Sequence, residues 1–309
     1  KNIDFKNKNI IITGASRGIG FETAKEFLKL GASISICSKN FKNLDYAVKK
    51  LTKFKSENQK IIFQVVDLTK EKKIIQFIKH SIKSFKQIHV LVNNAGIYGP
   101  KGQSENINLK DWKKTFDINF FGSVIFSKYL VKHFKKKNYG KIVQLGGGGV
   151  AGPIPRINAY GSSKIAIVRY MENLSHELNK YDININTIAP GAINTSMLDE
   201  ILKEGPKKVG DYYYKKALQQ KKNGGTPYKN AIDLITFLSS DYSNFLRGKI
   251  IHALWDDWKN FKYYKDKLSS SDLLTLKRKN PSSKWYTNGK NNLFSNYDRL
   301  FAHKKILNN

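Results

Sequence analysis

The sequence predicts an α/β domain built on a doubly wound parallel sheet, and two observations carry that prediction. Over the first 190 residues, short apolar runs alternate with longer segments of helical periodicity, an order that places helices on both faces of a parallel sheet. The short runs are apolar throughout, as expected for strands that are covered on both sides. With 309 residues, 40% of them hydrophobic, the chain is long enough for one such domain and an extension.

The first elements predict the start of this sheet. Residues 9–13, Asn-Ile-Ile-Ile-Thr, form a predicted buried strand, which a glycine-rich turn joins to a helix ending near Leu30. The same alternation continues at similar intervals along the chain. Strands are predicted at 32–37, 61–66, 88–92, 141–145 and 183–188, and the helices between them include 70–85, 111–137 and 158–180.

The last third of the chain has a different pattern. Residues 195–225 are charged and aromatic with weak periodicity, and we expect helices there that lie over the mouth of the sheet. An amphipathic helix is predicted at 231–240 and a final strand at 248–254. We therefore expect one α/β domain over 1–254. The extension at 255–309 then covers the substrate cleft, serves an oligomer interface, or is partly mobile.

The formal net charge of +31 raises the question of nucleic-acid binding. All but six of the 55 basic residues are lysine, and they are spread along the chain rather than gathered in one arm. Lysine and asparagine are both abundant, which an AT-rich coding sequence also explains. We therefore expect attraction to anionic small substrates, such as phosphorylated or nucleotide-linked ones, rather than a nucleic-acid partner.

Cysteine content and hydropathy limit the class of protein further. Cys37 is the single cysteine, so the sequence excludes an internal disulfide and a cysteine zinc cluster, and we predict no metal site. There is no run of 18 apolar residues and no segment that resembles a signal peptide. These features predict a cytoplasmic protein without a membrane span.

The turn after the first strand is rich in glycine, since residues 13–20 read Thr-Gly-Ala-Ser-Arg-Gly-Ile-Gly. Such a turn between a strand and a helix lets the backbone approach a pyrophosphate, and the helix N-terminus supplies free N–H groups and a partial positive charge. Its position at the start of the alternating pattern favours a dinucleotide site over a purely structural turn.

A tyrosine and a lysine one helical turn apart form the second chemical signal. Tyr160 and Lys164 share one face of the helix predicted at 158–180, so both can converge on one substrate. A free tyrosine, with a pKa of about 10, is a poor base at neutral pH. A neighbouring lysine ammonium favours the phenolate and lowers that pKa. The pair is therefore a candidate general acid and base.

Together these motifs resemble the short-chain dehydrogenase/reductase family. The sequence carries the other family motifs in family order: Asn-Asn-Ala-Gly at 93–96, Asn-Phe-Phe-Gly at 119–122, and Pro-Gly at 190–191 followed by Thr195. The resemblance spans residues 9–252. It implies a Rossmann fold, a nicotinamide cofactor, and hydride transfer to or from a carbonyl or hydroxyl group.

The resemblance also implies a role for each matching residue. Tyr160 is the general acid and base, Lys164 also holds the nicotinamide ribose, and Asn119 places a water in a proton relay to Lys164. Asp67 matches the family's adenine-contacting aspartate. The cofactor-binding residues implied in this way are Gly14, Ser16, Arg17, Gly18, Ile19, Gly20, Ser38, Lys39, Asp67, Leu68, Asn94, Ala95, Gly96, Tyr160, Lys164, Pro190, Gly191 and Thr195.

The end of the second strand, residues 37–40, indicates which nicotinamide cofactor is bound. A carboxylate there would hydrogen-bond the ribose 2′-hydroxyl and repel a 2′-phosphate, but the sequence reads Cys-Ser-Lys-Asn. Lys39 and Arg17 are both able to meet a 2′-phosphate. NADP(H) is therefore favoured over NAD(H). The alternative is that Lys39 is one more solvated lysine in a lysine-rich chain.

The segment before the predicted catalytic tyrosine departs from the family pattern. The family places a serine donor about 13 residues before the tyrosine, and Gly147 stands at that position here. Loss of such a donor typically costs about 3–4 kcal/mol. Three explanations are open. Backbone N–H groups of 146–149 bind the substrate oxygen; another side chain, such as Ser162, Thr195 or one from the C-terminal extension, donates instead; or the site has decayed and binds only the cofactor.

Three further segments resemble a subgroup of the family that is associated with surface-polysaccharide and nucleotide-sugar gene clusters. They read GGGG, GPKKVGDYYYKKALQQ and GKIIHALWDDW. Members of that subgroup commonly read Ser-Gly-Gly-Gly, so Gly146 is a further departure. Trp255 follows the last predicted strand, where an aromatic ring suits sugar hydroxyls; the alternative is that it anchors the extension. Gly146, Gly147 and Trp255 are therefore the predicted substrate residues.

The sequence leads to one main hypothesis and two alternatives. We expect an NADP(H)-dependent oxidoreductase that acts on a carbonyl, with a sugar or nucleotide-linked sugar as the favoured substrate. The first alternative is a catalytically weak NADP(H)-binding protein with a structural or regulatory role, and the second is a basic nucleic-acid binder. The apolar helices at 111–137 and 158–180, which relatives pair, predict a homo-oligomer, either a dimer or a tetramer.

Overall fold

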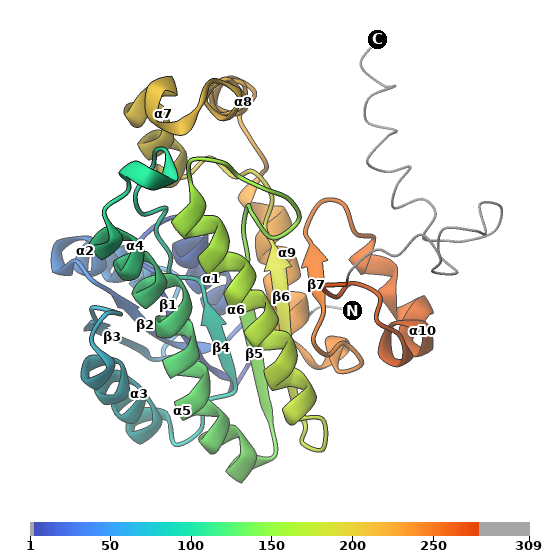
Figure 1. Cartoon of the computed structure of the whole chain (residues 1–309). Helices are drawn as coiled ribbons and strands as arrows, with labels where there is room; N and C mark the ends of the chain where they lie inside the picture. Colours follow the sequence, from blue (N-terminus) through green and yellow to red (C-terminus); the bar gives the residue numbers. More distant parts are fainter. Residues whose placement is uncertain (1–2, 278–309) are drawn as a thin grey trace. The chain divides into compact units, whose positions relative to one another are not determined.

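The computed structural model describes residues 3–277 of the chain (Figure 1). By its internal contacts the chain divides into two units, Lys1–Leu274 and Thr275–Asn309. The predicted extension at 255–309 therefore lies partly outside the described residues. No helix among the described residues combines the length and the apolar character that a bilayer span requires.

Seven strands form one sheet in the order β3-β2-β1-β4-β5-β6-β7. All neighbouring strands are parallel, so their carboxyl ends meet at one edge. The strand order reverses beside β1, which lies between β2 and β4, and in open α/β sheets a ligand crevice forms at such a point. The strands are β1 (Asn9–Thr13), β2 (Ser33–Ser38), β3 (Ile61–Val65), β4 (Val90–Asn93), β5 (Gly140–Leu145), β6 (Ile183–Ala189) and β7 (Ile250–His252).

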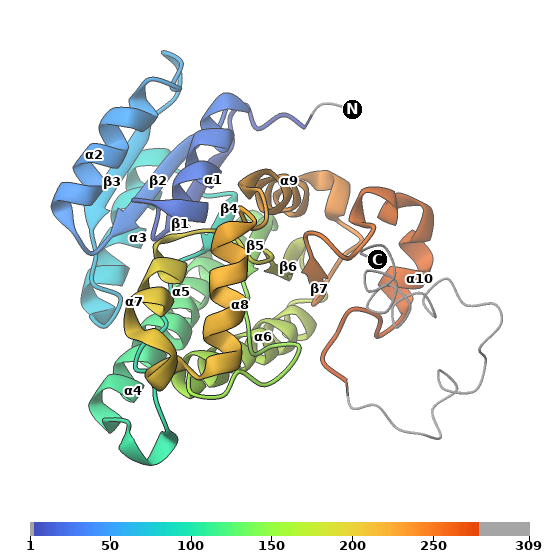
Figure 2. The ribbon, with the colours of Figure 1, turned by 90° about the horizontal axis from the view of Figure 1, so that it is seen from above.

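Two layers of helices cover the two faces of the sheet (Figures 1 and 2). Along β1, Ile10 and Ile12 join the apolar core under α1, α2 and α9, whereas Ile11 joins the core under α3, α5 and α6. This alternation follows from the two-residue period of a strand, and it confirms the predicted fold class. The covering helices are α1 (Gly18–Lys29), α2 (Phe41–Thr52), α3 (Glu71–Phe85), α5 (Gly122–Lys137), α6 (Asn158–Glu177) and α9 (Tyr228–Ser239).

The helix predicted at 111–137 is interrupted in the structure. The helix α4 (Leu109–Phe116) passes through a π-helical turn, Asp117–Phe121, before α5 begins. Such turns occur frequently at functional sites. This one contains Asn119, whose side chain is fully buried, so the interruption falls at a predicted catalytic residue.

Two helices lie over the carboxyl edge of the sheet, as the sequence predicts for 195–225. They are α7 (Ser196–Val209) and α8 (Asp211–Lys222). The strand arrows in Figure 1 point toward them, and Figure 2 shows them from above. α7 is kinked at Gly205, whose φ is +75°. Apolar side chains of both helices pack with Ile157 and Tyr160 of the loop and helix below.

The residues directly after β7 pack onto the sheet. A 3₁₀ segment, η4 (Trp258–Tyr264), and a short helix, α10 (Lys265–Ser270), follow the strand. Trp258, Phe261 and Leu268 are buried in the same core as α1 and α9. This part of the predicted extension therefore contributes to the apolar core of the first unit.

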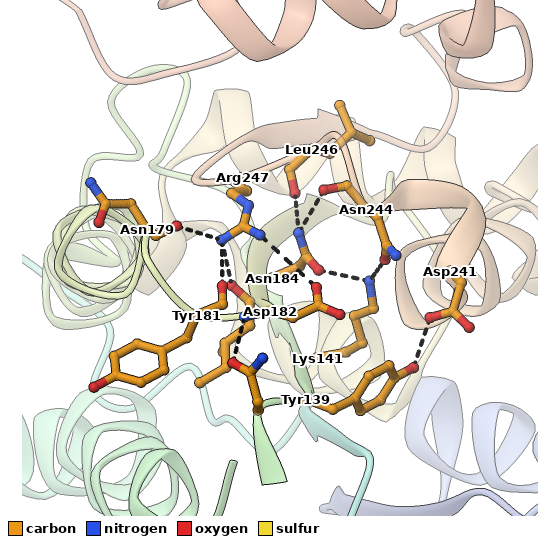
Figure 3. A network of polar contacts seen from close by, with 12 residues as sticks. Tyr139, Lys141, Asn179, Tyr181, Asp182, Asn184, Asp241, Asn244, Leu246 and Arg247 are labelled. Atoms are coloured by element: carbon orange, nitrogen blue, oxygen red, sulfur yellow. Dashed lines mark hydrogen bonds and ion pairs between the residues drawn. The ribbon is translucent and has the colours of Figure 1, made fainter. Parts of the chain in front are cut away.

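The amino ends of β5 and β6, opposite α7 and α8, hold a buried polar network (Figure 3). Lys141, the second residue of β5, donates from Nζ to Asn184 Oδ1 at 2.8 Å and to Asn244 Oδ1. Asn184 Nδ2 donates to the Asn244 carbonyl oxygen at 2.8 Å. Arg247 donates to the Tyr181 carbonyl oxygen at 2.9 Å. These bonds tie the segment before β7 to the two strands.

Candidate active site

The glycine turn between β1 and α1 has no room for side chains at two positions. At Gly14, where φ is +66°, a Cβ would lie 2.9 Å from Ala95 Cα. At Gly20, a Cβ would lie 2.4 Å from Asn94 Nδ2. Real Cβ atoms essentially never make contacts this short, so only glycine allows the turn to approach the end of β4.

The Asn-Asn-Ala-Gly motif at the end of β4 holds the glycine turn in place through hydrogen bonds. Asn94 Nδ2 donates to the carbonyl oxygens of Thr13 at 2.8 Å and Gly14 at 3.2 Å. In return, Thr13 Oγ1 accepts from the backbone N–H groups of Asn94 and Ala95, both at 3.0 Å. Both residues were predicted to contact the cofactor, and the structure shows that they also shape the turn.

The N-terminus of α1 is open to an anion. Arg17 precedes the helix in an extended conformation, and within the described chain its side chain caps no N–H group of the helix. The first turn, which includes Ile19, carries no acidic residue. The Thr195 methyl carbon lies 3.8 Å from the position that a Cβ of Gly18 would take. An anion at the N-terminus of α1 would meet free N–H groups and the positive end of the helix dipole.

Two polar pairs lie beside the end of β2. Ser16 Oγ is 2.9 Å from Ser38 Oγ, and Lys39 Nζ is 2.8 Å from Asp67 Oδ2. Burial acts to raise the pKa of the Asp67 carboxyl, but hydrogen bonds from Lys39 and Thr69 outweigh it and hold the pKa at about 2. The Lys39 side chain is 63% exposed, so solvent screens the ion pair and Lys39 is able to turn toward another anion.

Three more predicted cofactor residues lie at this edge of the sheet. Leu68 packs against Gly122 at the start of α5, with 3.3 Å between Leu68 Cβ and the position of a Cβ at Gly122. Pro190 and Gly191 directly follow β6. Gly191 has a φ of +90°, and a Cβ there would lie 3.4 Å from Leu254 Cδ1.

These features fit a nicotinamide dinucleotide. A pyrophosphate requires a close approach of backbone and an open helix N-terminus, which the turn around Gly14 and Gly20 and the start of α1 provide. Asp67 and Lys39 offer a carboxylate and an ammonium to the adenosine half of the dinucleotide.

Tyr160 and Lys164 lie on the buried face of α6, one turn apart, as their spacing predicts. Their exposed fractions are 7% and 3%. Lys164 Nζ donates to the carbonyl oxygen of Leu145, the last residue of β5, at 3.0 Å. The same nitrogen lies 5.7 Å from the centre of the Tyr160 ring. The end of β5 therefore positions the ammonium beside the phenol.

Burial dominates the electrostatics of this pair. It raises the pKa of the Tyr160 hydroxyl, with a further contribution from the Tyr213 phenol, and it lowers the pKa of Lys164 to about 8. The prediction that the Lys164 ammonium lowers the Tyr160 pKa is therefore wrong for this structure, because desolvation of the phenol prevails. Tyr160 is a neutral phenol in this state and holds a proton that it can donate.

Asn119 reaches the same place from the π-helical turn. Its Oδ1 accepts from the Ile97 backbone N–H, and its Nδ2 donates to the Ile97 carbonyl oxygen and to Ser163 Oγ, all at 2.9 Å. A Cβ at Gly96 would lie 3.3 Å from Asn119 Oδ1 and 3.4 Å from Lys164 Nζ. The two side chains therefore meet at one glycine, and the water relay between them stays a prediction.

The glycine run after β5 leaves no space for a side chain next to Tyr160. The Gly146 N–H donates to the Ile188 carbonyl oxygen at 2.8 Å and extends the pairing of β5 with β6, so a substrate does not have access to that donor. A Cβ at Gly147 would lie 2.2 Å from the Tyr160 hydroxyl oxygen. A serine at 147 would therefore displace the phenol.

The two side chains named as substitute donors have different surroundings. Ser162 is exposed on α6, and Thr195 Oγ1 accepts from the Met197 backbone N–H at 3.3 Å as the N-cap of α7.

Two tyrosines that were not predicted from the sequence border Tyr160. The Tyr98 ring packs edge-on against the Tyr160 ring, with centroids 4.8 Å apart. The Tyr98 hydroxyl lies 3.5 Å from the hydroxyl of Tyr213 on α8. The available signals were an aromatic residue two positions after the motif at 93–96, and the run of three tyrosines at 212–214.

Charged side chains hold α7 against the loops beneath it. Lys101, whose side chain is 3% exposed, pairs with Glu200 and lies 4.0 Å from Glu204. Arg156 Nη1 donates to the Lys207 carbonyl oxygen at 2.7 Å. These bonds connect α7 to the loops after β4 and β5.

Trp255 lies just beyond β7. Its ring packs edge-on against His252, with centroids 5.4 Å apart, and its backbone N–H donates to His252 Nδ1 at 3.2 Å. Burial lowers the pKa of His252 to about 4, which keeps the imidazole neutral and able to accept. These are the contacts of an anchor for the chain after β7, and a role of Trp255 toward substrate stays a prediction.

The sheet, the glycine cradle and the Tyr–Lys pair define a Rossmann-like α/β domain with the residues of an oxidoreductase. The model of the short chain dehydrogenase family matches residues 8–205. The chain belongs to this family, whose members bind NAD(H) or NADP(H).

Individual relatives agree with this assignment. The chain is 32% identical over 200 residues to 11-beta-hydroxysteroid dehydrogenase-like 3 of Arabidopsis thaliana, a match that covers 64% of this chain and 63% of that protein. It is 30% identical over 254 residues to dehydrogenase/reductase SDR family member 4 of Caenorhabditis elegans, covering 80% and 94%. The crystal structure of NAD⁺-bound xylitol dehydrogenase is similar with a TM-score of 0.73 and 25% identity, covering 80% of this chain and 98% of that one.

Proposed function

We propose that the protein is an NADP(H)-dependent oxidoreductase that transfers hydride to or from a carbonyl or hydroxyl group. The observation that carries the proposal is the convergence of Lys164 and Asn119 on Gly96, with Tyr160 beside Lys164. Gly96 belongs to the motif that also holds the glycine turn. The candidate reacting groups and the candidate cofactor cradle therefore share one edge of the sheet.

The mechanism assigns a task to each of these groups. A bound nicotinamide would supply or accept the hydride. The N-terminus of α1 binds the pyrophosphate. Tyr160, kept neutral by burial, gives its proton to the carbonyl oxygen in the direction of reduction. The Lys164 ammonium donates one of its three N–H groups to the Leu145 carbonyl oxygen. It directs the other two toward the nicotinamide ribose and toward Tyr160. Asn119 fixes the backbone at Ile97, and α7 with α8 keeps water out.

The proposed preference for NADP(H) is supported by Lys39 and Arg17. The Lys39 ammonium is exposed and stands at the end of β2, where a 2′-phosphate would gain from it. Exchange of Lys39 for aspartate is expected to reverse the ratio of kcat/KM values for NADPH and NADH. The xylitol dehydrogenase that resembles this chain holds NAD⁺, so the ratio in the unaltered protein is the first value to measure.

For the substrate, we propose a sugar or nucleotide-linked sugar. The resemblance to the polysaccharide-associated subgroup supports this class, and one structurally similar enzyme is named for a sugar alcohol. The net charge of +31 favours an anionic substrate over a neutral one, because like-signed lysines attract anions.

Exchange of Tyr160 for phenylalanine tests the proposed activity. With NADPH and 4-nitrobenzaldehyde as the probe, we expect kcat to fall by about 10²–10⁴-fold, the usual share of general acid catalysis. NADPH affinity is expected to stay within about threefold. Tyr212→Phe is the matched control, because Tyr212 is 77% exposed. An unchanged kcat in Tyr160→Phe contradicts the mechanism.

Gly147 favours a second candidate function, a catalytically weak NADP(H)-binding protein. In that case the unaltered protein and Tyr160→Phe both bind NADPH, and neither turns over any member of a panel of aldehydes, ketones and sugars.

A further inference from the structure

We propose that Tyr213 donates the hydrogen bond to the substrate oxygen that a serine at position 147 donates in relatives, and that Tyr98 positions it. This inference rests on the proposed function and adds residues to the same site. Tyr213 would touch the substrate oxygen and is assigned as a catalytic residue. Tyr98 acts through Tyr213 and is assigned as a positioning residue.

The loop after β5 is adapted to a glycine at position 147. A Cβ at Gly149, whose φ is +89°, would lie 2.6 Å from Gly161 Cα, so this loop packs directly on the start of α6. Gly147 lies against Tyr160, and a Cβ at position 147 would be 2.2 Å from the Tyr160 hydroxyl oxygen. In a site that had lost its function, close packing of the glycine backbone at both 147 and 149 would not be expected. The space that the serine would need is filled by the Tyr160 phenol.

Two of the named donors have partners in the structure: the Gly146 N–H donates to the Ile188 carbonyl oxygen, and Thr195 Oγ1 accepts from the Met197 N–H as the N-cap of α7. Tyr98 and Tyr213 are hydroxyl-bearing side chains in the wall around Tyr160. The loop after β4 carries one, and helix α8, above the site, carries the other.

The geometry divides the two roles. The Tyr98 ring is fixed edge-on against Tyr160, and its hydroxyl faces Tyr213 at 3.5 Å. When Tyr98 donates its proton to the Tyr213 oxygen, the Tyr213 O–H is free to point at a substrate. Tyr213 is only half-buried, and it lies on the element that closes over the carboxyl edge. Lys101 holds α7, and with it the start of α8, through Glu200.

The Tyr98 phenol has the protonation state that a donor needs. Burial raises the pKa of the Tyr98 hydroxyl, and Tyr213 and Tyr160 raise it further. A raised pKa keeps the O–H group neutral at physiological pH. The same surroundings keep the proton on Tyr160 until it is delivered to the substrate oxygen.

The first test compares hydroxyl deletions that keep every ring. In Tyr213→Phe, kcat for 4-nitrobenzaldehyde with NADPH is expected to fall by about 10²-fold, the usual effect of losing one such donor, with KM changed less than about threefold. In Tyr98→Phe, kcat is expected to fall by a smaller factor than in Tyr213→Phe. The double variant should be no slower than Tyr213→Phe, because a positioning residue acts only through its partner. Tyr212→Phe, on the same helix and exposed, is the matched control.

The second test does not require turnover. 4-Nitrophenolate carries an oxyanion at pH 8, and its absorbance reports binding in the presence of NADP⁺. The unaltered protein and Tyr212→Phe are expected to bind it with equal affinity, and Tyr213→Phe about tenfold more weakly. Equal affinity of all three proteins, including no binding by any of them, overturns the inference.

The two proposals fail in different ways. Turnover that depends on Tyr160 but is unchanged in Tyr213→Phe overturns this inference and leaves the proposed function intact. Absence of turnover together with weaker 4-nitrophenolate binding by Tyr213→Phe overturns the proposed function and supports the donor site.

Discussion

Two buried lysines lie at opposite ends of the same strand, and only one of them has the surroundings of a reactive group. Lys141 is the second residue of β5 and is 1% exposed; Lys164 reaches the last residue of β5 and is 3% exposed. Burial lowers the pKa of each to about 8. By burial and pKa alone the two are indistinguishable.

Their hydrogen bonds separate them. The Lys141 ammonium donates to two amide oxygens, those of Asn184 and Asn244, in a network closed by neighbouring carbonyl groups (Figure 3). Among the described residues, Lys164 Nζ has one hydrogen-bond partner, the Leu145 carbonyl oxygen, and a Cβ at Gly96 would lie 3.4 Å from this nitrogen. A perturbed pKa therefore marks a candidate site only where the group keeps unused donors and access.

The largest expected effect separates these two lysines by activity. Lys164→Met is expected to lower kcat for 4-nitrobenzaldehyde with NADPH by about 10²–10⁴-fold, because it removes a group of the proton-transfer site. Lys141→Met changes the same strand at its other end and is expected to keep kcat within about threefold. Steady-state kinetics on the two folded variants, checked by circular dichroism, measures both values. Equal losses of kcat in the two variants would contradict the assignment of Lys164 alone to the reaction.

The next effect concerns the glycine loop at the end of β5. Gly147→Ala places a Cβ against the Tyr160 hydroxyl, and a misplacement of about 1 Å at a reacting group costs about 10²-fold in rate. Gly147→Ser is expected to lose activity as well, although it restores a hydroxyl. The matched control is Gly152→Ala in the same loop, where a Cβ meets no atom of the described residues within 4 Å. A gain in kcat for Gly147→Ser would show that the site lacks a donor.

The strands and the cofactor cradle were predictable because their signals are local. Short segments of five or six residues rich in isoleucine or valine define β1, β2 and β5, and the glycine turn is contiguous in sequence. The Tyr160–Lys164 pair depends only on helical spacing. The motif at 93–96 is separate in the chain, but a parallel sheet brings successive strand ends to one edge, so its place beside the turn was predictable as well.

The remaining parts of the site depend on contacts between distant segments. Tyr98 and Tyr213 are 115 residues apart, and they meet only because α7 and α8 fold back over the sheet. The π-helical turn at Asn119 breaks a helical pattern that looked continuous. Lys141 stands in an apolar strand like many lysines near a strand end, and its burial follows from Asn184 and Asn244, which no local pattern connects to it.

The smallest expected effect tests whether burial lowers the pKa of Lys141. Its pKa is about 8 in the folded chain and about 10.5 in the unfolded chain. Between these values the unfolded chain binds more protons, so the free energy of unfolding rises with pH. Lys164 acts in the same direction, while the tyrosines with raised pKa values begin to oppose it only above about pH 10.

Lys141→Met is therefore expected to flatten the rise in unfolding free energy between pH 8 and 9.5 by about 1–2 kcal/mol, as measured by urea denaturation. Lowering the net charge of +31 also stabilises the fold as pH rises, and this general effect has to be separated. Lys42→Met, at an exposed position on α2, removes the same charge without touching the network and should keep the original slope. If both variants keep that slope, burial does not lower the pKa of Lys141, and the comparison between the two ends of β5 loses its electrostatic basis.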